Sequence, residues 1–442
     1  MVRYQPPEDW QQWVEWLAAG LHGRSRWRFS LILLGMVFAR GRRTVTTWLR
    51  AAGIQHDFAD YYYFLQPLGR KSKELALRLW ILLLVRLVTE ERVLLAVDDS
   101  PTKRYGPQVQ GAGIHHNPTP GPADQKFLYG HIWVTIALVL RHPLWQTIGL
   151  PLLGLLYVRA KDIAKIPAKH GWQFRTKLEL AVQALRQFAE VAIAAGKTVW
   201  VVADGAYAKR PFLRPLRAMG VTVVSRLRKD AALRTLPTPP KTRKRGRPRK
   251  YGPHRIHLAR RAAHPLGWQQ LECCVYGQQV TKTIKTFLAT YPPADGLIRV
   301  VIVQEDHGCE FFFCTDPEAT PRAIVEAFAD RAAIEQDFHD VKEVWGAGQQ
   351  QVRNIWTNVA AFNLNLWLHT LVEGWAWHKP AEEICDRSDS PWDDPARRPS
   401  HADRRKALRR QTLQNEYSSL SLTHRCSSKI RALYECLLQL AA

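Results

Sequence analysis

The residues best suited to chemistry lie in the segment FADRAAIEQDFHDVK, which runs from Phe328 to Lys342. Arg331 and Glu335 are four residues apart, and Lys342 lies two helical turns further on, so on one helix all three side chains project from the same face. A carboxylate flanked by two cations suits a site that binds a metal ion together with phosphate. An ordinary surface helix with ion pairs would show the same spacing, but the upstream sequence favours the first interpretation.

Two further acidic positions follow short apolar runs. Residues 93–97 (VLLAV) predict a buried strand that leads into Asp98-Asp99-Ser100, and residues 199–203 (VWVVA) predict another that leads into Asp204. A single aspartate at a strand end is more often a turn former or a helix cap. Asp98 and Asp99 would point to opposite faces of a continuing strand, so either one is a candidate for a shared site, and we favour Asp98.

Acids in the order Asp, Asp, Glu indicate phosphoryl transfer that uses two divalent cations. Two Mg²⁺ ions about 3.5 to 4 Å apart can hold the attacking and leaving oxygens of an in-line displacement, and Mn²⁺ can substitute for them. Carboxylate oxygens are the ligands that such ions prefer. We therefore expect Asp98 or Asp99, Asp204 and Glu335 to be the metal ligands and the catalytic residues, which requires the fold to bring them together.

The elements between these acids predict one sheet. Apolar segments at residues 130–140 and 144–158 are followed by a helical pattern at 175–195, the strand before Asp204, a short helix at 210–219 and a strand at 221–227. An antiparallel meander that leads into parallel strands, with a final helix returning to the site, is the order of a ribonuclease-H-like α/β fold.

These motifs resemble a known family. The order of the three acids, the strand-end sequence Asp204-Gly205-Ala206-Tyr207 and the R-x3-E-x6-K spacing resemble the DDE transposases of bacterial insertion sequences, in the group with a Tyr-Arg-Glu-Lys signature. The resemblance covers roughly residues 90 to 360. It implies cut-and-paste DNA transposition through a hairpin on the transposon end.

The resemblance also implies roles for individual residues. Arg331 and Lys342 would contact DNA phosphates near the cleaved end. The tyrosine of the signature corresponds to Phe328, which lacks the hydroxyl and keeps an aromatic face for stacking. Beside the first acids, Lys103 and Arg104 would either bind phosphate or offset the carboxylate charge.

Composition agrees with a DNA partner. The chain carries 63 Lys and Arg against 39 Asp and Glu, a net charge of +24, which attracts a polyanion strongly. Ribosomal proteins and proteins of anionic membranes can be equally basic, so charge alone does not identify the partner. We expect double-stranded DNA, as transposon ends and target, and a homodimer when two ends are synapsed.

One stretch concentrates this charge. Residues 241–250 read KTRKRGRPRK, a loop between proline-rich and glycine-rich segments. The Arg-Gly-Arg-Pro at its centre resembles an AT-hook, which lies in the narrow minor groove of A·T-rich DNA, although a solvated loop touching phosphates without base preference is the simpler interpretation. The residues expected to contact DNA here are Arg245, Arg247, Arg249 and Lys250.

Strand patterns between residues 268 and 314 predict a β-rich insertion between the second and third acids. In the transposases that the chain resembles, an insertion at this place takes part in forming the hairpin. Trp268 would wedge or stack against a flipped base, or else belong to the core. After Lys342, Arg353 stands near the start of an apolar helix and is a further candidate for phosphate contact.

The ends of the chain predict helices. Helical patterns at residues 10–21, 29–39, 43–52 and 73–88 indicate an N-terminal DNA-binding domain, with a purely structural helical cap as the alternative. The expected domains are 1–90 (α-helical), 91–228 (catalytic core, first part), 229–318 (basic loop and β-rich insertion), 319–380 (final helices of the core) and 381–442 (linker and basic helical tail).

Several classes are disfavoured. No apolar run is long and uninterrupted enough to cross a bilayer, and no secretory signal is evident, so we expect a cytoplasmic protein on the nucleoid and no membrane partner. The seven cysteines show no zinc-ligand spacing. The sequence thus predicts a transposase, with a ribonuclease-H-like nuclease or resolvase, or an inactive transposase-derived DNA-binding protein, as alternatives.

Overall fold

The computed structural model describes residues 4–117, 125–238, 249–387, 390, 392–394 and 396–419. Two of the predicted DNA-contacting residues, Arg245 and Arg247, lie outside these ranges. In the described part of the chain, no helix has both the length and the apolar character needed to span a membrane.

Five helices precede the first strand, one more than the sequence predicted. They are α1 (Glu8–Ala18), α2 (Gly23–Phe38), α3 (Val45–Ala51), α4 (Phe58–Arg70) and α5 (Ser72–Arg86). The unexpected one is α4, which contains three consecutive tyrosines and Pro67, residues that favour a helix poorly. Packing forms it instead: a side chain at Gly69 would collide with the backbone of Trp356, so glycine lets α4 pack closely against a later helix.

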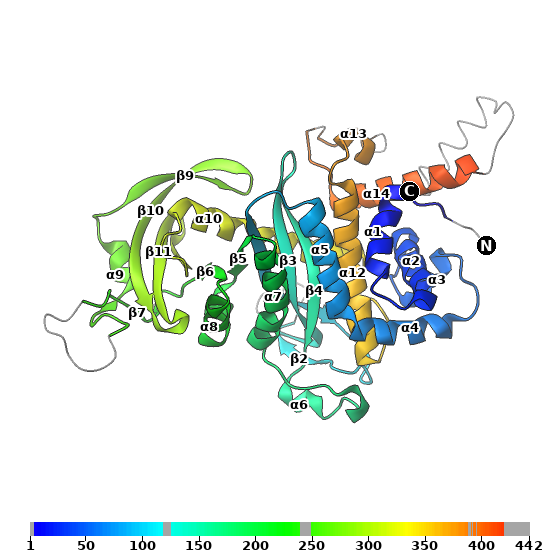
Figure 1. Ribbon diagram of the computed structural model, residues 1–442, viewed down its shortest axis with the longest axis horizontal. Coiled ribbons are helices and arrows are strands. Elements are labelled where there is room, and N and C mark those ends of the chain that lie inside the picture. Colours follow the sequence, from blue (N-terminus) through cyan, green and yellow to red (C-terminus); the bar gives the residue numbers. More distant parts are fainter. Residues whose placement is uncertain are drawn as a thin grey trace.

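The predicted strands and helices are observed in order in the central sheet, with β2 (Gly113–His116) and α6 (Ala160–Ile163) as additional elements. Its other elements are β1 (Arg92–Lys103), β3 (Phe127–His142), β4 (Gln146–Tyr157), α7 (Lys177–Ala194), β5 (Thr198–Ala203), α8 (Arg210–Ala218) and β6 (Thr222–Arg226). β1, β3 and β4 form an antiparallel meander, whereas β1, β5 and β6 run parallel. This large mixed sheet with helices is consistent with a ribonuclease-H-like fold (Figure 1).

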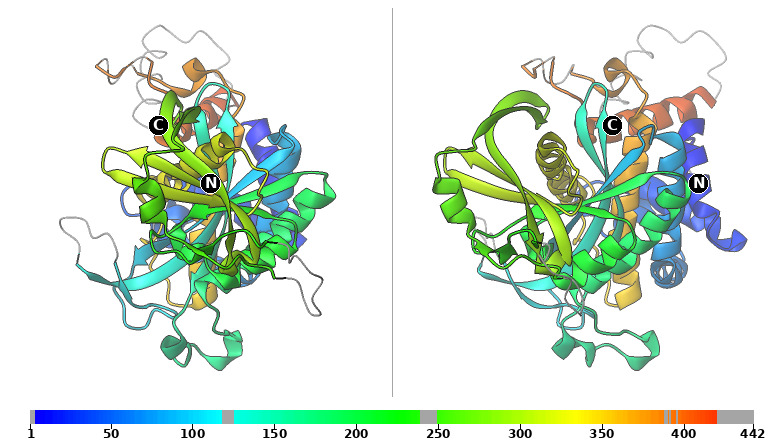
Figure 2. Two further views of the ribbon diagram at one scale, coloured as in Figure 1. Left: turned by 90° about the vertical axis from the view of Figure 1, so that its left-hand side faces the viewer. Right: turned by 60° about the vertical axis from the view of Figure 1, so that its left-hand side comes forward.

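The β-rich segment between the second and third acids extends the same sheet. It consists of β7 (Leu233–Arg234), β8 (Arg255–Ile256), α9 (Leu258–Ala263), β9 (Gln269–Val275), β10 (Gln278–Tyr291), β11 (Gly296–Glu305) and β12 (Gly308–Cys314). β12 pairs antiparallel with β6, which makes the insertion continuous with the central strands. These strands curve around α10 (Pro321–Asp330), as Figure 2 shows.

In the described part of the chain after α10, the helices are α11 (Ala332–Glu343), α12 (Ile355–Ala376), α13 (Ala381–Ile384) and α14 (His401–Ser419). α12 is buried along nearly its whole length between the sheet and the N-terminal helices (Figure 1). It covers β4, because Asn363 bonds both the amide and the carbonyl of Gly154, and Trp367 and Thr370 donate to further carbonyls of that strand. A sheet edge is thereby kept from pairing with other chains.

The tail helix α14 is a packed element of the fold. Arg405 and Arg409 are buried and donate to the carbonyls of Val37 and Ala39 at the end of α2. Carbonyls at the end of a helix lack partners within the helix, so these arginines cap α2 from across the molecule. These two arginines of the tail therefore serve to cap a helix inside the protein.

Candidate active site

Two of the predicted acids lie where the parallel pairing of β1 and β5 ends. The two strands pair in register up to Val97 and Ala203; Asp98 is the next residue of β1, which continues to Lys103, and Asp204 directly follows β5. Since parallel strands present their carboxyl ends at one edge of a sheet, the two carboxylates are neighbours. The charge of Asp204 contributes to raising the pKa of Asp98, as expected of such neighbours.

Asp98 and Asp99 face opposite sides of the sheet, as the alternation of a strand requires. β1 continues through both residues, paired with Thr135 and Val134 of β3. Asp98 receives an ion pair from Arg331, 2.8 Å away, on the side where α10 and α11 pack. Asp99 pairs instead with Lys177 of α7, at 2.6 Å. The geometry therefore places Asp98, and not Asp99, on the side of the third predicted acid.

Arg331 connects the first acid to the third. Its Nη1 lies 2.8 Å from Asp98 Oδ2, and its Nη2 lies 2.6 Å from Glu335 Oε1. The predicted single helix is in fact divided here, because α10 ends at Asp330 and Arg331 is the N-cap of α11. Arg331 keeps right-handed helical backbone angles, so the predicted i, i+4 relation between Arg331 and Glu335 survives the division.

The accumulation of carboxylates makes this site electrostatically costly. Burial raises the pKa of Asp98 to about 6, and the charges of Asp99 and Asp204 add to this, against the opposing effects of Arg331 and of a backbone hydrogen bond from Asp99. Burial and the charge of Asp99 also raise the pKa of the Tyr207 hydroxyl, which lies 3.5 Å from Asp99 Oδ1. Negative charge at this point is stabilised by cations.

This donor set fits divalent cations. Asp98, Asp204 and Glu335 offer carboxylate oxygens, the ligands of Mg²⁺ and Mn²⁺, and neither sulfur nor imidazole is among them. The guanidinium of Arg331 pairs with two of them, Asp98 and Glu335. Asp98 is held rigidly in the sheet, whereas the Glu335 side chain is 57% exposed at the open side of the site.

A basic groove of about 1270 Å³ lies beside Asp99. It is bounded by the end of β1, by β2, by the first turn of α7 and by residues 347–349. The cations that line it are Arg42, Lys103, Arg159, Lys177 and Lys342. The groove therefore brings the predicted Lys103 and Lys342 together from distant parts of the chain and adds Arg42, Arg159 and Lys177.

Arg104 does not line this groove. It is buried, at 6% exposure, and its guanidinium donates to the carbonyls of Gly348 and Gln350. Burial lowers its pKa to about 10. The structure thus gives Arg104 an internal role, in which it fixes the chain after α11 against the end of β1.

The other predicted DNA contacts are dispersed. Phe328 packs against Phe312, with ring centroids 4.6 Å apart, and lies under the Arg331 guanidinium. Trp268 is half-buried beneath Lys285, whose ammonium is 4.4 Å from its ring.

Among the residues of the basic loop and its surroundings, Lys250 pairs with Asp295 at 2.6 Å. Arg249 and Arg353 are exposed. The structure therefore does not gather these three cations with the acids.

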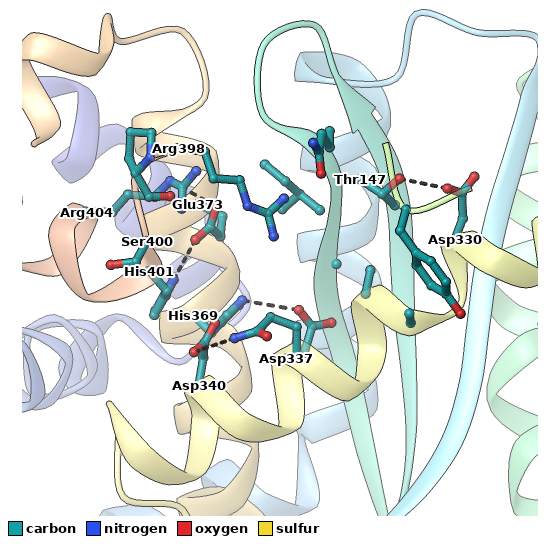
Figure 3. A pocket seen from close by; sticks show the side chains of 18 of the residues that line it. Thr147, Asp330, Asp337, Asp340, His369, Glu373, Arg398, Ser400, His401 and Arg404 are labelled. Atoms are coloured by element: carbon teal, nitrogen blue, oxygen red, sulfur yellow. Dashed lines mark hydrogen bonds and ion pairs between the residues drawn. The ribbon is translucent and has the colours of Figure 1, made fainter. Parts of the chain in front are cut away.

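A second charged cluster, absent from the sequence predictions, lies behind α11 (Figure 3). His369 and Glu373 of α12 and His401 of α14 are buried together, and Asp337 of α11 lies 3.4 Å from His369. Its members come from three helices and are far apart in sequence, so no local motif could reveal it.

The hydrogen bonds of this cluster argue against a metal at His401. The indole N–H of Trp345 donates to His401 Nε2 at 2.7 Å, which requires the proton of the neutral ring to be on Nδ1. That proton is donated to Glu373, 2.6 Å away. Both ring nitrogens are thus committed. Burial lowers the pKa of His401 to about 4, in agreement with a neutral ring.

Comparison with family models gives a match. The model described as DDE superfamily endonuclease matches residues 17–288, which is more than half of the chain. The matched part contains Asp98, Asp99 and Asp204 and ends before Arg331 and Glu335. A search of curated proteins found no match.

Proposed function

Because the chain belongs to the DDE superfamily of endonucleases, we propose that it is a DNA transposase of the cut-and-paste type. The observations that support the proposal are that Asp98 and Asp204 follow paired residues of two adjacent parallel strands and that Arg331 joins Asp98 to Glu335 of a late helix. Family membership supports phosphoryl transfer on DNA. The third acid, outside the matched region, supports a complete catalytic set.

Asp98, Asp204 and Glu335 would hold two divalent cations, Mg²⁺ or Mn²⁺. Bound there, such ions supply an activated water and stabilise the charge that develops on the attacking and leaving oxygens. By holding these ions where the pairing of β1 and β5 ends, the carboxylates would fix the place at which the reacting phosphate binds. Positioning and charge stabilisation then account for most of the rate.

The basic groove would hold the DNA backbone beside this site. Lys103, Lys177 and Lys342 line it next to Asp99, which follows Asp98 on β1 and faces the opposite side of the sheet, so a phosphate chain in the groove would approach the proposed acids from that side. Arg42 adds a contact from the N-terminal helices, which we propose bind the transposon end. Phosphate contacts of this kind fix the position of the duplex.

The reaction consists of two kinds of step, and both are displacements at the phosphorus of a phosphodiester. In the first, water attacks a phosphodiester at the transposon end, the P–O bond to the departing 3′ oxygen breaks, and a proton from water is released to solvent. In the second, the 3′-OH attacks a phosphodiester of the target strand, forming one P–O bond as another breaks. We propose that two copies of the chain, each with one end, act together.

The test is cleavage of DNA that carries the ends flanking the gene of this protein, with Mg²⁺. We expect the wild type to cut at those ends and Glu335→Gln to bind them without cutting. Glu318→Gln, which changes an exposed glutamate outside the site, is the control and should cut normally. Equal cutting by Glu335→Gln would remove Glu335 from the site. Cutting without preference for the ends would indicate a general nuclease, and binding without cutting by the wild type an inactive DNA-binding protein.

A further inference from the structure

Arg331 occupies the oxygens that the proposed metal site needs. Asp98 Oδ1 accepts the backbone N–H of Asp99 at 2.8 Å, and Asp98 Oδ2 accepts Arg331 Nη1. Glu335 Oε1 accepts the other terminal nitrogen of the same guanidinium at 2.6 Å. A cation bound between Asp98 and Glu335 through these oxygens would have to displace Arg331 from both carboxylates.

The Arg331 side chain is fixed in place, but not all of its hydrogen-bond donors have a partner in the described residues. Its side chain is 15% exposed, and the guanidinium lies 5.4 Å from the ring of Phe328, a cation–π arrangement that fixes one side of it. Its Nε is buried and has no hydrogen-bond partner among the residues that the structure describes. A buried donor without a partner lowers the stability of this arrangement, so a competing acceptor such as a phosphate oxygen gains by binding the side chain elsewhere.

We propose that Arg331 is an exchangeable counter-cation of the active site: it bridges Asp98 and Glu335 until a divalent cation takes those carboxylates, and it then turns to the DNA backbone. This inference rests on the proposed metal site. It adds a coupling between metal binding and DNA contact, because the guanidinium cannot bridge the two carboxylates and grip a phosphate at the same time. The bridge also offsets the charge of a site that must stay folded before it binds metal.

The coupling predicts that removing the guanidinium strengthens metal binding. The experiment measures the affinity of the full-length protein for Mn²⁺, without DNA, by electron paramagnetic resonance of the free ion. Arg331→Gln should bind Mn²⁺ at least about tenfold more tightly than the wild type, because two charge-assisted hydrogen bonds no longer compete. Arg331→Lys, whose ammonium is a single point of charge and pairs poorly with both carboxylates at once, should fall between the two.

The matched control is Arg141→Gln. Arg141 also pairs with two carboxylates, but those of Glu326 and Asp330 are not part of the proposed metal site, so its loss should leave Mn²⁺ affinity unchanged. Unchanged or weaker Mn²⁺ binding by Arg331→Gln would overturn the proposal, and Arg331→Lys provides the same comparison if the Gln variant does not fold. Asp98→Asn tests the proposed metal site separately from the proposed role of Arg331. If it binds Mn²⁺ as the wild type does, the metal site itself is wrong.

Discussion

The buried cluster behind α11 predicts a large loss of stability for Glu373→Gln. The Glu373 side chain is 3% exposed and pairs with Arg404 at 3.2 Å and with His401 at 2.6 Å. Burial alone would raise the pKa of Glu373, but Arg404 and the hydrogen bond from His401 outweigh it and lower the pKa from 4.5 to about 2. At about 1.4 kcal/mol per pKa unit, the folded protein stabilises the ionised form by about 3 kcal/mol.

The sign of the pH dependence follows from that direction. Because the pKa is lower in the folded than in the unfolded protein, the contribution of Glu373 is fully present above the unfolded pKa and is lost as the pH falls towards 2. Glutamine keeps the size of the side chain and leaves the Arg404 charge buried without its partner. We expect Glu373→Gln to lower the free energy of unfolding by about 3 kcal/mol at neutral pH, and by progressively less as the pH falls below about 4.5.

The assay is urea unfolding followed by tryptophan fluorescence between about pH 3 and pH 7. Glu383→Gln, at an exposed position in α13, is the matched control and should change the free energy of unfolding by less than about 0.5 kcal/mol. A loss below about 1 kcal/mol for Glu373→Gln, or a loss that does not shrink in acid, would refute the assignment of Glu373 as a buried, ionised partner of Arg404.

Two further predictions concern the groove and the packing of the helices. Lys177→Ala should weaken DNA binding and lower by about one the number of counterions released on binding, measured by fluorescence anisotropy at several salt concentrations. The control is Lys406→Ala, at an exposed position, which should change neither quantity. Equal effects of the two variants would argue against the groove as the DNA site. Gly69→Ala should lower the free energy of unfolding by more than about 2 kcal/mol, because the added methyl collides with the backbone of Trp356 in α12, whereas Gly23→Ala meets open space. Similar thermal melts for both glycine variants would show that α4 and α12 are not packed so closely.

The sequence predicted the two central strands because each is a continuous apolar run that leads into acids, although β1 continues beyond Asp98 and Asp99 to Lys103. Val93–Val97 and Val199–Ala203 lie within β1 and β5, and the order of strands and helices between the acids is as expected. Alternation also predicted that Asp98 and Asp99 face opposite sides. Which side carries the third acid depends on where α11 packs, and that is a tertiary property.

The rest of the site could not be predicted for the same reason. Arg159 and Lys177 enter the groove from the end of β4 and the start of α7, where nothing in the local sequence marks them as ligands for phosphate. Arg104 was expected to meet phosphate or to offset the acids, but its neighbours in space are carbonyls more than 240 residues away. Helix α4 was missed because its intrinsic preference is poor and packing against α12 overrides it.

The most direct test of the central claim compares Asp98→Asn with Asp99→Asn in Mg²⁺-dependent cleavage of a transposon-end fragment under single-turnover conditions. Asp98 shares Arg331 with Glu335, whereas Asp99 pairs with Lys177 in the groove. We expect Asp98→Asn to lower the cleavage rate by at least about a thousandfold and Asp99→Asn to lower it by less than about tenfold. The reverse order, or equal losses, would contradict the assignment of Asp98, Asp204 and Glu335 as the catalytic set.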